Sequence, residues 1–272
     1  MAIRLTDLAF TNSRFNIRRL HDLVAVYGPS KQEQEICTLA GQLLSEHCTD
    51  IETDNEGNLY AIRRGEAGAD TVLLCAHMDT VFFPPQERVI VTEDGYMQLG
   101  GITLQNSIAG TPILGGDDRA GMEIILSILE SYQGPLNIKV LFTVREEIGG
   151  QGMHDANRSF LAGIGFGLVL DRKHSGDVVT IIERKRLCDR KLTNRILKAG
   201  RFAHVRDLNV TDGAFSDAYF LSRRFQVPCA NLSVGYYHPH SPMERIDLHA
   251  LDDSVRWVQA ILDSCEHDPV QR

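Results

Sequence analysis

The stretch "TVLLCAHMDT", residues 71–80, places a short apolar run directly before a histidine and an aspartate. An uninterrupted apolar run of this length is typical of a strand that is buried on both faces of a sheet. Runs of the same kind recur along the chain at residues 137–144, 166–170, 178–182 and 229–235. Helical patterns separate several of them. This alternation predicts a three-layer αβα sandwich with a mixed sheet that is parallel at its centre.

Helical apolar spacing marks the segments between and around these runs. Ser30 and Glu33 have the spacing of a capping box, so a helix is expected to start there. Asp94 and Gly95 interrupt "RVIVTEDGYMQL", residues 88–99, in the manner of a tight hairpin turn. The predicted helices are residues 16–28, 30–48, 119–132, 214–225 and 249–265.

Length and charge limit the classes of protein to consider. The chain has 272 residues and a net charge of -8, which suits one large soluble domain and disfavours nucleic acid or an anionic membrane as a partner. The amino end lacks the apolar block of a signal peptide, and the six cysteines form no CxxC pair. We therefore expect a cytoplasmic protein with reduced thiols. Residues 1–272 are predicted to form a single domain with a hairpin and loop excursion at about 82–113.

Polar residues follow the apolar runs at the points where the predicted strands end. Ligands of open α/β sheets bind outside the carboxyl ends of the strands, so these residues should gather at one edge. A further pair, Asp117 and Asp118 in "GGDDRAG", leads into the predicted helix 119–132. The residues that follow strands are His77, Asp79, Glu146, Glu147, Asp171, His238 and His240.

Each cluster has an ordinary explanation when it is taken alone. Acids at a helix start cap free N–H groups and favour the positive end of the helix dipole, and a histidine is commonly a surface residue. Their coincidence at one sheet edge is harder to explain, because crowded carboxylates repel one another unless a positive group neutralises them. Histidine and carboxylate without cysteine is the ligand set of a hydrolytic metal site, here a dinuclear one.

The ordered series HxD, GxDDRxG, EE, a lone Asp and a late His resembles the ligand pattern of the co-catalytic metallopeptidases. This clan holds peptidase T and the carboxypeptidase G-like enzymes, the tetrahedral aminopeptidases and the aminopeptidase Y-like enzymes. The likeness spans about residues 70 to 247, and "LGGDDRAG" and "FTVREEIGGQG" look most like peptidase T and the tetrahedral aminopeptidases. The resemblance implies the zinc-dependent exopeptidase fold, also called phosphorylase/hydrolase-like, and two divalent metal ions, Zn²⁺ with Co²⁺ or Mn²⁺ as alternatives.

The resemblance also implies a role for each residue. One metal would be held by His77 and Asp171, the second by Glu147 and His240, with Asp117 bridging the two. Glu146 would be the general base and Asp79 would orient His77. His240 takes the ligand role because it stands in "HSPME", the family's "HSxxE" context, and His238 is left as an orienting or substrate-side group.

The spacing departs from the lid-bearing relatives. Only 69 positions separate Asp171 from His240, too few for the lid of peptidase T-like enzymes, and only 38 separate Asp79 from Asp117. The layout is closest to the aminopeptidase Y-like group. A dimer made through a lid is put in doubt, and a homo-oligomer of another kind is left open.

The leading interpretation is an aminopeptidase that acts on short peptides. The first alternative is an amidohydrolase that removes the acyl group of an N-acyl amino acid. A non-catalytic binding module and a cyclase-type transferase on the same fold are further alternatives, although the complete ligand set favours a hydrolase. Arg119, Arg145 and Tyr236 are near enough in sequence to face the cleft, but surface or packing roles are favoured for them.

Overall fold

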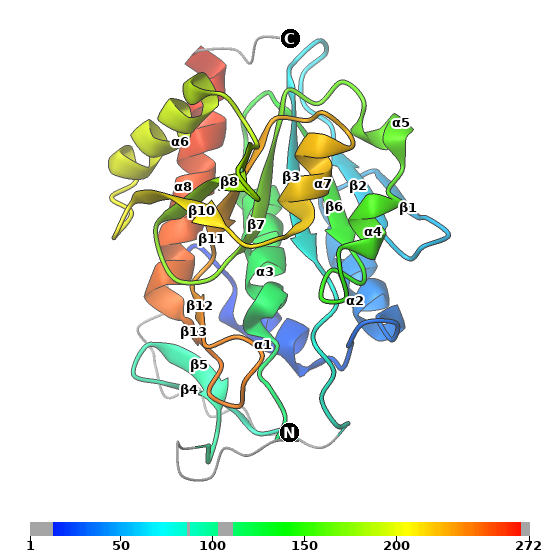
Figure 1. Ribbon diagram of the computed structural model, residues 1–272, viewed down its shortest axis with the longest axis vertical. Helices are drawn as coiled ribbons and strands as arrows, with labels where there is room; N and C mark the ends of the chain where they lie inside the picture. The colour runs from blue at the N-terminus through cyan, green and yellow to red at the C-terminus, as the bar shows by residue number, and fades with distance from the viewer. Residues whose placement is uncertain (1–12, 86–87, 103–110, 268–272) are drawn as a thin grey trace.

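The computed structural model describes residues 13–85, 88–102 and 111–267 (Figure 1). Within these residues the main sheet has nine strands in the order β1-β2-β6-β3-β7-β11-β8-β10, with β9 paired to β8. The strands are β1 (Asp50–Thr53), β2 (Leu59–Arg63), β3 (Thr71–His77), β6 (Asn137–Thr143), β7 (Phe166–Arg172), β8 (Asp177–Ile182), β9 (Lys185–Arg186), β10 (Asn209–Gly213) and β11 (Cys229–Ser233).

The middle of the sheet is parallel, antiparallel pairs flank it on both sides, and the marginal pair β8–β10 is again parallel. Strands β6, β3, β7 and β11 run parallel as neighbours, whereas β2 is antiparallel to β6 and β8 is antiparallel to β11. The predicted mixed sheet with a parallel centre is therefore confirmed. Because parallel neighbours end at the same edge, the residues that follow β3, β6 and β7 come together there.

Side chains alternate between two hydrophobic cores along the central strands. On β3, Val72, Leu74 and Ala76 belong to one core and Leu73 and Cys75 to the other. This alternation gives the three predicted layers. The helices that pack in the first core are α1 (Ile17–Ala25), α2 (Gln34–Leu44), α3 (Gly116–Ser131), α6 (Arg190–Phe202) and α8 (Leu248–His267). The helices that pack in the second core are α4 (Gln151–His154), α5 (Arg158–Leu161) and α7 (Asp217–Arg223).

A second, antiparallel sheet lies at the lower end of the molecule in Figure 1. Its β4 (Ile90–Glu93) and β5 (Tyr96–Leu99) form the predicted hairpin, and Asp94 and Gly95 take the positive φ values, 51° and 81°, that such a turn requires. The prediction missed the hairpin's partner. Strand β5 pairs with β13 (Arg245–Asp247), which in turn pairs with β12 (Tyr236–Tyr237). Residues 86–87 and 103–110 of the excursion lie outside the described residues.

The predicted capping box is wrong. Glu33 precedes α2, but its carboxylate accepts hydrogen bonds from the N–H groups of Lys31 and Arg145 rather than capping Ser30. The hydroxyl of Ser30 instead donates to the carboxylate of Asp79 at 2.6 Å. The sequence pattern S-x-x-E is present, but the hydroxyl of Ser30 binds the carboxylate of Asp79 instead of the helix start.

All six cysteines are free thiols, and five of them are buried. Among the described helices, none is both long and apolar enough to cross a bilayer.

Candidate metal centre

Two adjacent strand ends and the start of a helix bring three of the predicted residues together. His77 is the last residue of β3 and lies opposite Thr143, the last residue of β6. Asp171 lies near the end of β7, the other neighbour of β3. Asp117 lies at the start of α3 rather than at the end of a strand. It and Asp118 have non-helical backbone angles there.

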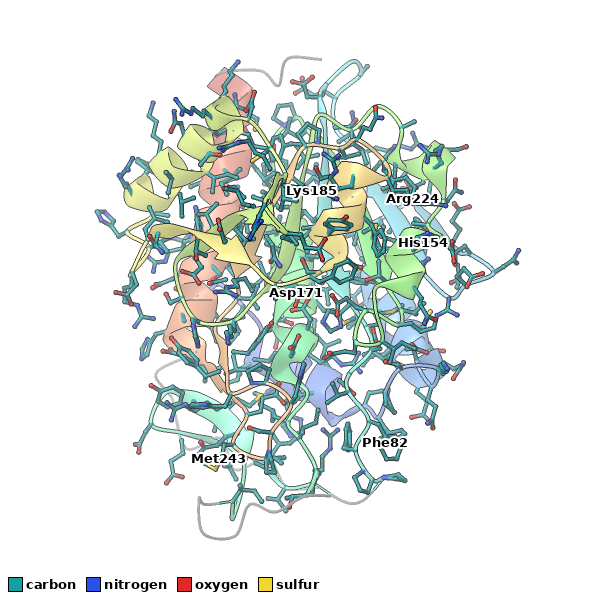
Figure 2. The ribbon with its side chains drawn as sticks, viewed as in Figure 1. Phe82, His154, Asp171, Lys185, Arg224 and Met243 are labelled. Atoms are coloured by element: carbon teal, nitrogen blue, oxygen red, sulfur yellow. The ribbon has the colours of Figure 1, made fainter. Side chains whose placement is uncertain are left out.

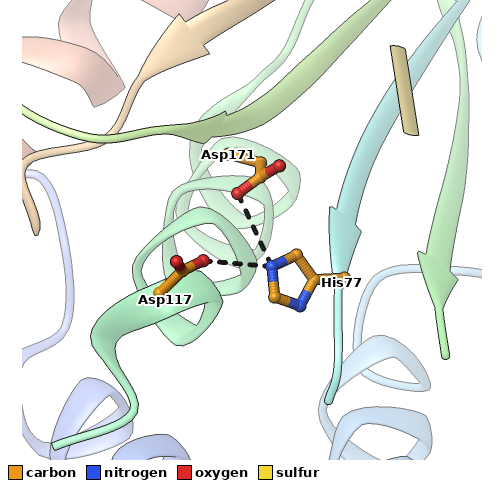
Figure 3. Close-up of side chains that lie close together, drawn as sticks. All are labelled: His77, Asp117 and Asp171. Atoms are coloured by element: carbon orange, nitrogen blue, oxygen red, sulfur yellow. Dashed lines mark hydrogen bonds and ion pairs between the residues drawn. The ribbon is translucent and has the colours of Figure 1, made fainter. Parts of the chain in front are cut away.

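The first group of candidate ligands surrounds Nε2 of His77 (Figure 3). This nitrogen lies 3.0 Å from Oδ1 of Asp117 and 3.5 Å from Oδ1 of Asp171. Asp171 lies near the middle of the molecule in the view of Figure 2. It also lines a cavity. We call His77, Asp117 and Asp171 the His77 triad.

The second group surrounds Nε2 of His240. It lies 2.9 Å from Oε1 of Glu147 and 3.2 Å from Oδ2 of Asp117. We call His240, Glu147 and Asp117 the His240 triad. In each triad, one ligand atom per residue lies within 4.8 Å of the others. The two triads share Asp117 but use different oxygens of its carboxylate, which is the arrangement that a bridging ligand requires.

The electrostatics of the protein without bound ions show the same crowding. Burial raises the pKa values of Glu146 and Asp171, and neighbouring carboxylates raise them further. Burial alone would also raise the pKa of Asp117, but hydrogen bonds with His240 and His77 hold it at about 2. Hydrogen bonds to Asp117 and Glu147 raise the pKa of His240 to about 10. The two imidazoles therefore supply the positive charge that the carboxylates demand.

Asp79 organises the segment that carries the two glutamates. Its carboxylate accepts hydrogen bonds from the N–H groups of Glu146 and Glu147, at 2.9 and 3.2 Å, and from Ser30. Toward His77 the shorter contact is made by the backbone: Nδ1 lies 2.9 Å from the carbonyl oxygen of Asp79 and 3.6 Å from its carboxylate. The sequence prediction gave this orienting role to the carboxylate of Asp79, whereas the closer contact with His77 is made by its main chain.

Glu244 is a residue whose role the sequence did not reveal. It is 1% exposed, and its two oxygens accept hydrogen bonds from the N–H groups of Gly115 and Asp117, at 2.7 and 2.9 Å. His240 lies on the same loop as Glu244. The carboxylate of Glu244 therefore connects the loop that carries His240 to the segment that carries Asp117. The "HSPME" motif contained this glutamate, but its partners lie more than 120 positions away.

Of the three residues for which packing roles were favoured, Tyr236 contacts a candidate ligand. Its hydroxyl lies 3.0 Å from the carbonyl oxygen of Asp171 and 3.2 Å from Oδ1 of that residue. Arg119 is fully buried, and burial lowers its pKa to about 9. Arg145 pairs with Glu56 away from both triads. His238 belongs to neither triad and borders a separate small cavity.

A cavity of about 240 Å³ opens beside the triads. Among the residues that the structure describes, none of the hairpin β4–β5 lines this cavity. A larger cavity of about 490 Å³ lies at the opposite end of β7, around Phe166 and Leu192, and contains none of the predicted site residues. The smaller cavity contains five of the predicted site residues, and it is lined by Asp117, Glu146, Glu147, Asp171, Arg172, Lys173, Val179, Gly213, Ala214, Phe215, Ser216, Asn231, Tyr236 and His240.

The family match places this protein in the metallopeptidase clan that the sequence pattern indicated, and the mixed sheet agrees with that class. The chain belongs to the family of M42 glutamyl aminopeptidases, whose family model matches residues 92–256, more than half of the chain.

The chain is also similar to one curated protein and to several solved structures. An uncharacterized protein of Bacillus subtilis, YqjE, is 30% identical over 181 residues, which cover 62% of this chain and 46% of the relative. The chain thus spans about half the length of that curated relative. Among solved structures, aminopeptidase PepT of Bacillus cereus has a TM-score of 0.77 at 19% identity, covering 93% of this chain and 100% of that one. A tripeptidase of Staphylococcus aureus has a TM-score of 0.77 at 17% identity, with 94% and 100% covered. At these identities the likeness shows the shared fold.

Proposed function

We propose that this protein is a metallo-aminopeptidase that hydrolyses short peptides at a dinuclear site. The observation that carries the proposal is the division of the Asp117 carboxylate, with one oxygen near each histidine. Family membership supports the peptidase class. A single structural ion pair would not need two histidines and two further carboxylates around the same aspartate.

The donor set fits two divalent ions. His77 and Asp171 would hold one, Glu147 and His240 the other, and Asp117 would contact both. Nitrogen and carboxylate oxygen without thiolate suits Zn²⁺, and Co²⁺ or Mn²⁺ as alternatives. Such a pair of ions supplies Lewis-acid polarisation of the scissile carbonyl and lowers the pKa of water toward about 7.

Glu146 is the residue proposed to move the proton. It lines the cavity but belongs to neither triad, so its carboxylate is available to accept the proton of the attacking water and deliver it to the leaving amine. Asp79 positions it by accepting the hydrogen bond of its N–H group. Tyr236 holds Asp171 through its hydroxyl.

The aminopeptidase reading rests on charge. Four carboxylates line the cavity, and a surrounding net charge of -8 favours a substrate that presents a free ammonium group. Removal of the acyl group from an N-acyl amino acid is the alternative with the same chemistry. Assembly as a homo-oligomer stays a prediction, which light scattering of the purified protein would check.

The test combines metal removal with a substrate screen. Chelation should abolish hydrolysis of short peptides, and Zn²⁺, Co²⁺ or Mn²⁺ should restore it. Acetylation of the peptide's amino terminus should remove most of the activity. Elemental analysis without a bound divalent metal, together with hydrolysis that is indifferent to chelator, would overturn the metal site. Faster hydrolysis of N-acyl amino acids than of free-amine peptides would leave the metal site intact and favour the amidohydrolase.

A further inference from the structure

Two basic residues line the cavity beside the triads, and they differ in their pairing. Arg172 is neutralised by Asp177, whose carboxylate lies 3.0 Å from its guanidinium. Lys173 is half-buried, and no carboxylate of the described residues lies within ion-pair distance of its ammonium group. Its main chain is fixed, because the hydroxyl of Ser233 donates to its carbonyl oxygen at 2.9 Å. Lys173 thus borders the cavity as a cation that has no ion-pair partner among the described residues.

The acids of the cavity do not remove this imbalance once the site is loaded. Asp117, Glu146, Glu147 and Asp171 together carry four negative charges, and two divalent ions carry four positive ones. These charges balance among themselves, and none of the four carboxylates forms an ion pair with Lys173. An ammonium group without an ion-pair partner favours an anionic ligand, and in a peptidase that ligand is supplied by the substrate.

We propose that Lys173 binds a carboxylate of the substrate and so determines which peptides are cleaved. This inference rests on the proposed peptidase function and adds a specificity determinant to it. Asp171 and Lys173 are two positions apart in the chain, so the substrate carboxylate would lie close to the scissile bond. A cavity of about 240 Å³ holds a ligand of the size of a dipeptide. The substrates are therefore short peptides with a carboxylate near the bond that is cleaved.

Two parts of a short peptide can supply that carboxylate, its carboxyl terminus or an acidic side chain. Comparison of Leu-Gly with its carboxyl-terminal amide tests the terminus. Comparison of Glu-Gly amide with Gln-Gly amide tests the side chain. Wild-type protein should prefer the carboxylate-bearing member of at least one pair by about 10- to 100-fold in kcat/KM, the range for a hydrogen bond to a charged group.

Substitution tests whether Lys173 causes this preference. Lys173→Met keeps the aliphatic stem and removes the charge, so the preference should fall to near one. The matched control is Lys198→Met, because Lys198 is exposed on α6 and does not line the cavity. It should keep the wild-type ratio. A preference that survives in Lys173→Met, or wild-type protein that treats both members of both pairs alike, would overturn the inference.

Binding gives a readout that does not depend on turnover. In the Glu146→Gln background, calorimetry should show tighter binding of the same carboxylate-bearing peptide, and Lys173→Met should remove the difference. Peptides that bind with this discrimination but are never hydrolysed by wild-type protein would contradict the proposed function and support the role of Lys173. Peptides that are hydrolysed without this discrimination would support the proposed function and contradict the role of Lys173.

Discussion

The two oxygens of Asp117 face two different histidines: Oδ1 lies 3.0 Å from Nε2 of His77 and Oδ2 lies 3.2 Å from Nε2 of His240. These histidines are separated by more than 160 residues of sequence. One carboxylate therefore links the two halves of the candidate metal centre.

Asp117→Ala should disturb both metal positions, because each triad loses a ligand. We expect elemental analysis to show far less than two ions per chain and peptide hydrolysis to disappear. Asp118→Ala is the comparison, since Asp118 accepts hydrogen bonds from backbone N–H groups of His77 and Gly121 and belongs to neither triad. Loss of one ion only in Asp117→Ala would show that this residue does not bridge.

Glu146 and Glu147 should differ although they are adjacent. Glu146→Gln should lower kcat by about 10²- to 10⁴-fold and keep both ions, since it is expected to transfer a proton. Glu147→Gln should lose metal as well, because its carboxylate lies in the His240 triad. Metal content measured beside kcat separates the roles, and equal metal content in the two variants would contradict this division.

The two histidines of "YYHPHSPM" provide a similar contrast. His240→Ala should weaken the second metal position, whereas His238→Ala should leave both ions in place and change mainly KM. Of these two histidines, His240 is the one that lies within hydrogen-bond distance of Asp117 and Glu147. Titration of each variant with Zn²⁺ tests this expectation, and the reverse pattern would make His238 the ligand.

Glu244→Gln should lower metal affinity without removing a ligand. The carboxamide oxygen can accept a hydrogen bond from one of the two N–H groups, that of Gly115 or that of Asp117. Its NH₂ group then faces the other N–H group, and two donors cannot form a hydrogen bond. Loss of an orienting partner costs about 10- to 100-fold in metal affinity. Competition with a chelator measures this, and exposed Glu93→Gln is the control. Unchanged affinity in Glu244→Gln would show that the loop keeps its position without it.

Gly121 allows α3 to lie against β7. A Cβ added there would lie 1.9 Å from the carbonyl oxygen of Leu170 and 2.5 Å from Oδ1 of Asp118. Gly121→Ala should therefore lower the free energy of unfolding by about 1–3 kcal/mol. Gly41→Ala is the control, because no atom lies within 4 Å of its added Cβ on α2, and it should stabilise by about 0.5–1 kcal/mol. Denaturant unfolding of the metal-free proteins measures both, and equal stability of the two variants would contradict the contact.

Several features of this protein were determined by local sequence. Buried parallel strands need continuous apolar runs, so residues 71–76 and 166–170 could be predicted as buried strands, and the polar residues after them as neighbours at one edge of the sheet. The turn at Asp94 and Gly95 could be predicted for the same reason, since a tight turn depends on the residues within it.

Only the tertiary structure decided how those segments meet. Whether Ser30 caps its own helix or binds Asp79 depends on a residue that lies 49 positions away, just after β3. The two oxygens of Glu244 find their N–H donors nearly 130 positions upstream, and β13 pairs with a hairpin almost 150 residues earlier. These long-range contacts depend on how the segments pack against one another. Many of them use backbone N–H groups, and because every residue except proline has such a group, the sequence does not mark which N–H group will be the partner. Sequence patterns therefore predict which residues can act, whereas the fold decides which of them are brought together.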